Sequence, residues 1–149
     1  MLRYIAPALS VVALGVAAFG CASMFIHGAR LVGSDTPTAG ALARWEVPAC
    51  TGSDGRPMTP PTGQHYLLLK SAVGTELFEQ GADGSGSIIE NQWSDSAGTH
   101  FYSWVQSKGW EFIIPGPGQP GLRRVYVTGT TQGRPNGIWV AQCPMVPVQ

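Results

Sequence analysis

Short apolar runs separated by turn residues recur from residue 65 to the end of the chain, and this rhythm limits the possible folds most strongly. The runs are rich in β-branched and aromatic residues, and Gly, Ser, Asp, Asn or Pro interrupt them every 8 to 13 residues. Such spacing is typical of an antiparallel sandwich or barrel. The 20 Gly and 12 Pro also disfavour long helices. The runs cover 65–70, 75–80, 87–93, 99–106, 110–114, 123–129 and 137–143.

We therefore expect an all-β fold, a small antiparallel meander of about seven or eight strands that forms a barrel or a sandwich. Short connections favour pairing between strands that are neighbours in sequence. The stretch around Trp45 could supply an eighth strand. Alternation along the strands assigns apolar side chains to the core. The expected core residues are Leu67, Leu69, Leu77, Ile89, Phe101, Val105, Phe112, Ile114, Val125, Val127, Ile138 and Val140.

The N-terminal segment is apolar, and residues 4–26 carry no charged side chain. As a helix this segment would be about 34 Å long, sufficient to span a hydrocarbon core of about 30 Å. The sequence therefore predicts a transmembrane or signal helix within residues 1–26. A signal anchor is the preferred interpretation, because the apolar run is longer than the core of a typical cleaved signal.

Two other interpretations of this segment stay open. The stretch "AFGC" at 18–21 resembles the end of a bacterial lipoprotein signal, which makes Cys21 a candidate lipidation site. It departs from that pattern at Ala18 and Phe19. Cleavage after Ala22 by an ordinary signal peptidase is the third interpretation. All three interpretations export the rest of the chain. Residues 27–44 are rich in Gly, Ser and Thr, which predicts a flexible tether, followed by an extracytoplasmic β-domain over 45–149.

The three cysteines indicate the redox compartment. Cys50 and Cys143 lie near opposite ends of the predicted domain, whereas Cys21 lies in the apolar segment. We expect a Cys50–Cys143 disulfide, which requires an oxidising compartment. Two free thiols in a cytosolic protein are the alternative. The chain has no Cys-x-x-Cys pair or Cys/His cluster, so the sequence predicts no metal site.

The charge balance disfavours a nucleic-acid partner. From residue 45 onward there are six basic side chains (Arg56, Lys70, Lys108, Arg123, Arg124, Arg134) against eight acidic ones (Glu46, Asp54, Glu76, Glu79, Asp83, Glu90, Asp95, Glu111). A mildly acidic domain lacks the basic surface that nucleic-acid binding requires.

Catalytic motifs are not recognisable in this sequence. There is no Gly-x-Ser-x-Gly motif, and Glu76 and Glu79 fall on opposite faces of one predicted strand, so they cannot act as a pair. We therefore predict no catalytic residue and no cofactor. A hydrolase that uses dispersed His and acidic residues is the least favoured alternative.

The aromatic residues suggest a binding surface. On the 99–106 strand, His100, Tyr102 and Trp104 share one face, where they could stack on a glycan or an apolar ligand. The competing interpretation places the five Trp residues in the core. The preferred function is a membrane-tethered, non-catalytic interaction or envelope-structural module. Its expected partners are the membrane, through residues 4–26, and an envelope protein or a glycan. A ligand-binding β-barrel is the alternative.

Overall fold

The computed structural model of the protein describes residues 26–35, 40–127 and 129–149. Cys21 and almost all of the expected N-terminal helix lie outside these described residues. The described chain is all-β and every strand pair is antiparallel, as the sequence predicted. Over the described ranges, no helix is long and apolar enough to cross a membrane.

The strands follow the predicted runs and add shorter elements between them. Most of them join one sheet in the order β1-β7-β6-β5-β2-β14-β11-β10-β9-β8. Beside this path, β3 pairs with β14 and with β4, and β12 pairs with β13 as a separate hairpin. Their bounds are β1 Ala29–Val32, β2 Ala43–Glu46, β3 Cys50–Gly52, β4 Pro57–Met58, β5 His65–Ser71, β6 Gly74–Gln80, β7 Gly86–Ile89, β8 Gln92–Asp95, β9 Gly98–Val105, β10 Lys108–Ile114, β11 Gly121–Val127, β12 Thr130–Thr131, β13 Arg134–Pro135 and β14 Ile138–Pro147.

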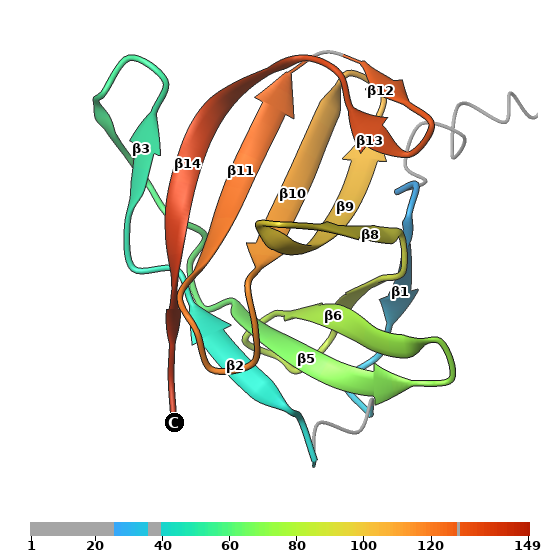
Figure 1. The fold of residues 1–149 in the computed structure, drawn as a ribbon. Coiled ribbons are helices and arrows are strands. Elements are labelled where there is room, and N and C mark those ends of the chain that lie inside the picture. Colours follow the sequence, from blue (N-terminus) through green and yellow to red (C-terminus); the bar gives the residue numbers. More distant parts are fainter. Residues whose placement is uncertain (1–25, 36–39, 128) are drawn as a thin grey trace, which may run out of the picture.

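The sheet bends into two layers that cross each other. In Figure 1, β14, β11, β10 and β9 stand side by side, and β2, β5 and β6 cross below them. Strand β14 joins the layers, because its earlier residues pair with β11 and Val146 and Pro147 pair with β2. We call β8–β11 with β14 the upper layer, and β1, β2 and β5–β7 the lower layer.

The sheet does not close into a barrel, so this half of the predicted alternative is wrong. Strands β1 and β8 end the sheet order and do not pair with each other. The predicted 87–93 strand is instead split at a corner, where the backbone N–H groups of Glu90 and Asn91 both donate to the carbonyl of Gly28. The chain passes there from the lower layer to the upper one. An isolated bridge between His27 and Trp104 lies beside this corner.

The hydrophobic core lies between the two layers. Alternate residues of both layers point inward, which places Phe101 and Phe112 of the upper layer against Tyr66, Leu68 and other residues of the lower one. The rest of this core cluster consists of Trp45, Val47, Cys50, Leu77, Ile89, Ile114, Cys143 and Met145. A smaller cluster of Leu67, Phe78 and Ile88 covers the outer face of the lower layer.

Two of the expected core residues are wrong. Val127 is 44% exposed and Ile138 is 74% exposed. They pair with each other at one end of the upper layer, where the core cluster of the crossing layers does not reach. Alternation assigns a residue to a face of the sheet, but it does not tell how far the other layer covers that face.

The segment expected to be a tether contributes to the sheet. Residues Ala29–Val32 form β1 and pair with β7, and Ala43 begins β2. Gly28 is held by the 90–91 corner, and His27 exchanges backbone hydrogen bonds with Trp104 of 2.8 and 3.1 Å. Polar and small residues predicted a linker, but an edge strand needs only its backbone groups to pair. The folded domain therefore begins before residue 45.

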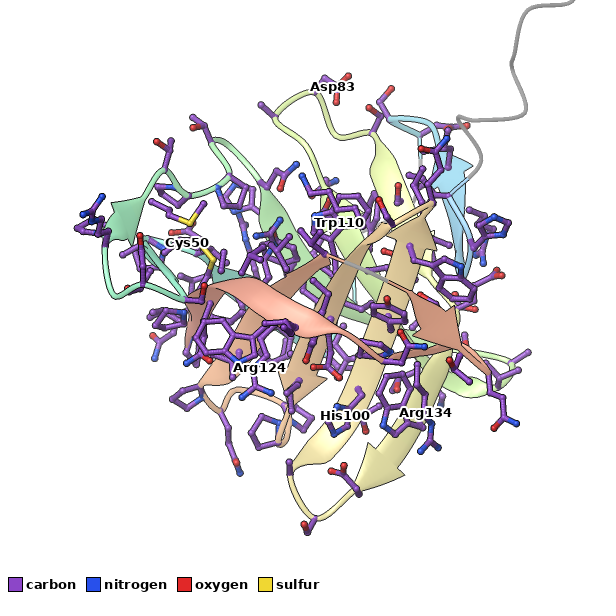
Figure 2. All side chains as sticks on the ribbon, turned by 90° about the horizontal axis from the view of Figure 1, so that it is seen from above. Cys50, Asp83, His100, Trp110, Arg124 and Arg134 are labelled. Atoms are coloured by element: carbon purple, nitrogen blue, oxygen red, sulfur yellow. A yellow bond between two sulfur atoms is a disulfide. The ribbon has the colours of Figure 1, made fainter. Side chains whose placement is uncertain are left out.

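The Cys50–Cys143 disulfide is present, as the sequence predicted. It joins β3 to β14 across 93 residues of chain, and both cysteines are buried. The bridge is drawn beside the Cys50 label in Figure 2. It fixes the arm formed by β3, β4 and the residues that follow against the upper layer.

Candidate functional site

An apolar groove lies between the β3–β4 arm and the inner face of the upper layer. It has a volume of about 420 Å³, within the range of about 300–1,000 Å³ that is usual for small-molecule sites. We call it the Trp110 groove. Its lining consists of Cys50, Met58, Thr59, Pro60, Pro61, Lys108, Trp110, Arg123, Val125, Val127, Val140, Ala141 and Cys143.

The groove exists because the upper layer is longer than the part that the lower layer covers. Trp110 and Val125 are register partners on β10 and β11, and Lys108 and Val127 are partners one step further along. Their side chains share the inward face with Phe112, which lies in the core. Beyond Phe112, Trp110 still packs against the edge of the core cluster. The rest of this face meets the Pro-rich arm, and a gap remains between them.

The lining is mostly apolar and partly open to solvent. Met58 is 47% exposed and Val127 is 44% exposed, at opposite walls of the groove. Exposed apolar side chains that meet in a concavity are typical of binding sites, and Met adapts easily to ligand shape. A concavity of similar volume, about 430 Å³, lies beside residues 40–44 and the C-terminus, but none of its described lining residues is aromatic.

Two cationic side chains belong to the groove. The Lys108 ammonium lies 5.5 Å from the centre of the Trp110 ring, and the Arg123 guanidinium lies 5.9 Å from that of Phe112. Arg123 Nη1 also donates to the sulfur of Cys143 over 3.7 Å. Of the described residues, none that lines the groove is Asp or Glu.

A smaller cavity of about 110 Å³ adjoins the groove at Trp110 and is lined also by Ile26, Glu79, Ser87, Ile89 and Ser103. Burial raises the pKa of the Glu79 carboxyl, and the nearby charge of Arg123 opposes this shift only in part. Because Ile26 lines this cavity, the chain enters the domain beside Trp110.

The opposite face of the upper layer carries a buried polar network. In Figure 2, Trp110 and His100 lie on opposite sides of the upper sheet. The His100 network, as we call it, comprises Asp95, His100, Glu111 and Tyr126. Nδ1 of His100 lies 3.0 Å from Glu111 Oε2, and Nε2 lies 2.8 Å from Asp95 Oδ1. The Tyr126 hydroxyl donates to Glu111 Oε1 over 2.9 Å.

The network affects the pKa of two of its members. The hydrogen bond from His100 and a second from the Ala97 backbone N–H hold the pKa of Asp95 below its usual value. Burial and the Glu111 carboxylate raise the pKa of Tyr126 to about 12. Tyr126 therefore remains a hydrogen-bond donor at all physiological pH values.

Aromatic rings cover the network. Trp93 stacks on His100 with ring centres 4.9 Å apart, and the Arg134 guanidinium lies 4.9 Å from the Trp93 ring centre. Tyr102 stacks on Trp104, which stacks on His27, at 5.5 Å in each case. These stacked side chains form a second packed layer outside the sheet.

The structure brings together His100, Tyr102 and Trp104 on one face, but it does not leave them free. Tyr102 has no exposed surface and its hydroxyl lies 2.8 Å from Thr130 Oγ1 of the β12–β13 hairpin. His100 is 7% exposed, and both of its ring nitrogens already face carboxylates. A general base needs a free nitrogen within reach of a substrate proton. The described part of the chain also holds no group of three His, Cys, Asp or Glu side chains that could bind a metal ion.

Sequence reasoning did not identify the Trp110 groove or the His100 network. The alternation of Trp110 with Phe112 was visible, but the end of the core along that strand was not. The network joins residues from β8, β9, β10 and β11, and nothing in the sequence indicated which carboxylate would face His100.

Comparison with known proteins adds no information about function. No protein-family model matches the chain. No curated protein and no solved structure matches it either. The function is therefore inferred from the residues of this chain alone.

Proposed function

We propose that this protein is a non-catalytic binding module on the extracytoplasmic side of a membrane, and that the Trp110 groove holds a small apolar ligand. The observation that carries the proposal is the groove itself, an apolar concavity of about 420 Å³ that the layers leave open. Its volume and its mostly apolar lining with two cationic side chains are typical of small-molecule binding sites. A ligand that filled the groove would bury Met58 and Val127.

The disulfide supports the proposed location. Structural disulfides persist in oxidising compartments and are rare in the cytosol. The apolar segment 4–26 is the proposed membrane attachment, and Ile26 connects it to the domain. Intact mass measured on protein extracted from membranes distinguishes the forms of attachment. A full-length mass indicates an anchor, loss of residues 1–20 with added acyl mass indicates lipidation of Cys21, and loss without acyl mass overturns the tether.

The outer face of β9 is a weaker candidate for binding. A glycan platform made by Tyr102 and Trp104 would need their ring faces, and the rings stack on each other with Tyr102 fully buried. A hydrolase centred on His100 would need a free ring nitrogen, and both nitrogens have carboxylate partners. We therefore favour the groove as the ligand site.

The test is ¹⁹F NMR of the full chain labelled with 5-fluorotryptophan in nanodiscs of neutral lipid, titrated with the neutral alcohol 1-dodecanol. The Trp110 resonance is identified with Trp110→Phe. We expect a saturable shift of Trp110, whereas Trp93 and Trp104 on the opposite face stay unchanged.

A matched pair of variants on β14 completes the experiment. Val140 lines the groove, and Ile138 lies two residues away and is 74% exposed. Val140→Phe should fill the groove and weaken binding about tenfold or more, whereas Ile138→Phe should leave it unchanged. Absence of a saturable Trp110 shift, or equal affinity in the two variants, would contradict the proposal.

A further inference from the structure

The groove combines an apolar wall with two cations that lack ion-pair partners. Within the described residues, no carboxylate lies within 4.0 Å of a nitrogen of Lys108 or Arg123. Arg30, in contrast, pairs with Glu76 and Glu90. The Glu79 carboxyl of the adjoining small cavity is near enough to interact with the charge of Arg123, but it forms no salt bridge with it and does not line the groove. The described lining of the groove therefore carries two cations and no carboxylate.

Arg123 also holds a donor that lacks an acceptor. Its Nε is buried and has no hydrogen-bond partner among the described residues. A buried donor left unpaired costs about 1–3 kcal/mol, so such groups are normally satisfied. The planar guanidinium donates in a fork that fits a carboxylate or a phosphate with two parallel hydrogen bonds. A carboxylate or phosphate oxygen that reaches this guanidinium would supply the acceptor that no described residue supplies.

The two cations mark opposite ends of the groove. Arg123 pairs with Phe112 at the core end, and Lys108 pairs with Val127 at the exposed end. Val127 is four positions after Arg123 on an extended strand, which corresponds to about 13 Å. The wall between them consists of Trp110 and Val125, both apolar. A ligand that fits this order has an anionic head at Arg123 and an apolar chain along Trp110 and Val125.

We infer that the ligand of the Trp110 groove is a single-chain anionic amphiphile, with a carboxylate or phosphate head bound by Arg123. This inference rests on the proposed function, since it names the class of ligand for the same groove. Lys108 covers the chain with its methylene stem and attracts the anion to the open end. Ile26 lies at the neighbouring cavity, so a chain tethered through residues 4–26 would hold the groove close to the membrane surface.

The experiment compares two ligands that differ only in the head. Full-length protein labelled with 5-fluorotryptophan in neutral nanodiscs is titrated with dodecanoate and with 1-dodecanol, and the Trp110 resonance reports binding. A charge-assisted hydrogen-bond pair should make dodecanoate bind about tenfold or more tightly than dodecanol. Dodecyl phosphate should behave like dodecanoate, and dodecyltrimethylammonium should bind more weakly than dodecanol.

The chain provides a matched control in the neighbouring arginine. Arg123 points into the groove, whereas Arg124 lies on the outer face, where its Nε donates to Gln142 Oε1 over 3.3 Å. Arg123→Gln should reduce the preference for dodecanoate to about twofold or less, and Arg124→Gln should preserve it. Arg123→Lys should keep part of the preference. If Arg123→Gln does not fold, the ratio of the dodecanoate and dodecanol affinities of the unmodified protein still tests whether the ligand is anionic.

The outcomes separate the two proposals. If dodecanol and dodecanoate bind at Trp110 with equal affinity, the anionic class is wrong and the binding function stands. If neither ligand shifts Trp110, the binding function is wrong as well. Nanodiscs that contain lysophosphatidic acid, which has one acyl chain, are the final comparison. A Trp110 shift without added dodecanoate identifies the bilayer as a source of the amphiphile, and no shift identifies a free amphiphile as the ligand.

Discussion

His100 and Glu111 face each other on neighbouring strands, with His100 Nδ1 3.0 Å from Glu111 Oε2 and both side chains nearly inaccessible to solvent. Each carboxylate oxygen of Glu111 has a partner, because the Tyr126 hydroxyl donates to the other one. Ionisable groups are rarely buried unless they are paired in this way. The outer face of the upper layer is therefore a second packed region.

Removal of the Glu111 carboxylate should destabilise the fold strongly. Glu111→Ala leaves His100 and the Tyr126 hydroxyl without their partner, and breaking a buried pair costs about 3–5 kcal/mol. Urea unfolding followed by fluorescence measures the change in the free energy of unfolding. Glu90→Ala is the control, because Glu90 is 49% exposed and pairs with a half-exposed arginine, Arg30. Equal losses in the two variants would show that the network contributes little.

Addition of one methyl group at Gly109 should also destabilise the protein. A Cβ there would overlap the phenol of Tyr102, with Cε2 and Cζ of the ring at 2.6 Å. Because Tyr102 is fully buried and stacked on Trp104, its ring has little room to move. We expect Gly109→Ala to cost about 1–3 kcal/mol.

The control for this prediction is Gly116→Ala. A Cβ at Gly116 would meet only the end of the Gln119 side chain, at 3.3 Å, which can move away. The free energy of unfolding of Gly116→Ala should stay within about 0.5 kcal/mol of that of the unmodified protein. Thermal unfolding by circular dichroism is the measurement, and a Gly109→Ala midpoint equal to that of the control would contradict the close approach.

Loss of the Cys50–Cys143 disulfide should lower stability and loosen the groove. The bridge closes a loop of 93 residues, for which the chain-entropy relation gives about 4–5 kcal/mol as an upper value. Guanidinium unfolding of the Cys50→Ala/Cys143→Ala double variant tests this, with Cys21→Ala as the control. The β3–β4 arm forms one wall of the groove, so the double variant should also lose dodecanol binding. A change below about 1 kcal/mol would contradict the expected contribution.

Stability should depend on pH through Glu79. Because burial raises its pKa in the folded state, the folded protein binds this proton more tightly than the unfolded chain does. The contribution of protonated Glu79 to the free energy of unfolding is complete below the ordinary pKa of Glu, about 4.3. It is lost as the pH rises through the raised pKa of Glu79 in the folded state. Glu79→Gln cannot ionise, so its stability relative to the unmodified protein should increase from pH 4 to pH 7.

Guanidinium unfolding at several pH values measures this difference. Glu90→Gln, at an exposed position, is the control and should follow the unmodified protein. A Glu79→Gln variant that loses stability relative to the unmodified protein as the pH rises would mean that attraction to Arg123 outweighs burial.

The sequence predicted the strands well where local signals are strong. Runs such as 65–70, 75–80 and 99–106 correspond closely to β5, β6 and β9, because β-branched and aromatic residues alternate between clear turn signals. The turn before β9 is a clear example. Gly98 has a φ of +128°, a conformation that other residues rarely adopt, so glycine marks the reversal. Weakly patterned strands such as β1 were missed.

The candidate sites were less predictable than the strands. Tyr102 and Trp104 were correctly assigned to one face, but the β12–β13 hairpin covers Tyr102 there, with Thr130 against its hydroxyl. The Trp110 groove depends on where the lower layer ends and where the β3–β4 arm begins. Both are long-range relationships, and period-two alternation contains no information about them.

The sequence by itself determined that the chain is β-rich, that its strands alternate two faces and that Cys50 and Cys143 are the two cysteines available for a disulfide within the domain. Those properties follow from local propensities, period-two patterning and cysteine number. Only the tertiary structure decided which faces are covered, because coverage depends on the crossing of two layers and on segments far apart in sequence. That crossing leaves Trp110, Val125 and Arg123 lining a groove and buries Tyr102 and His100 on the opposite side.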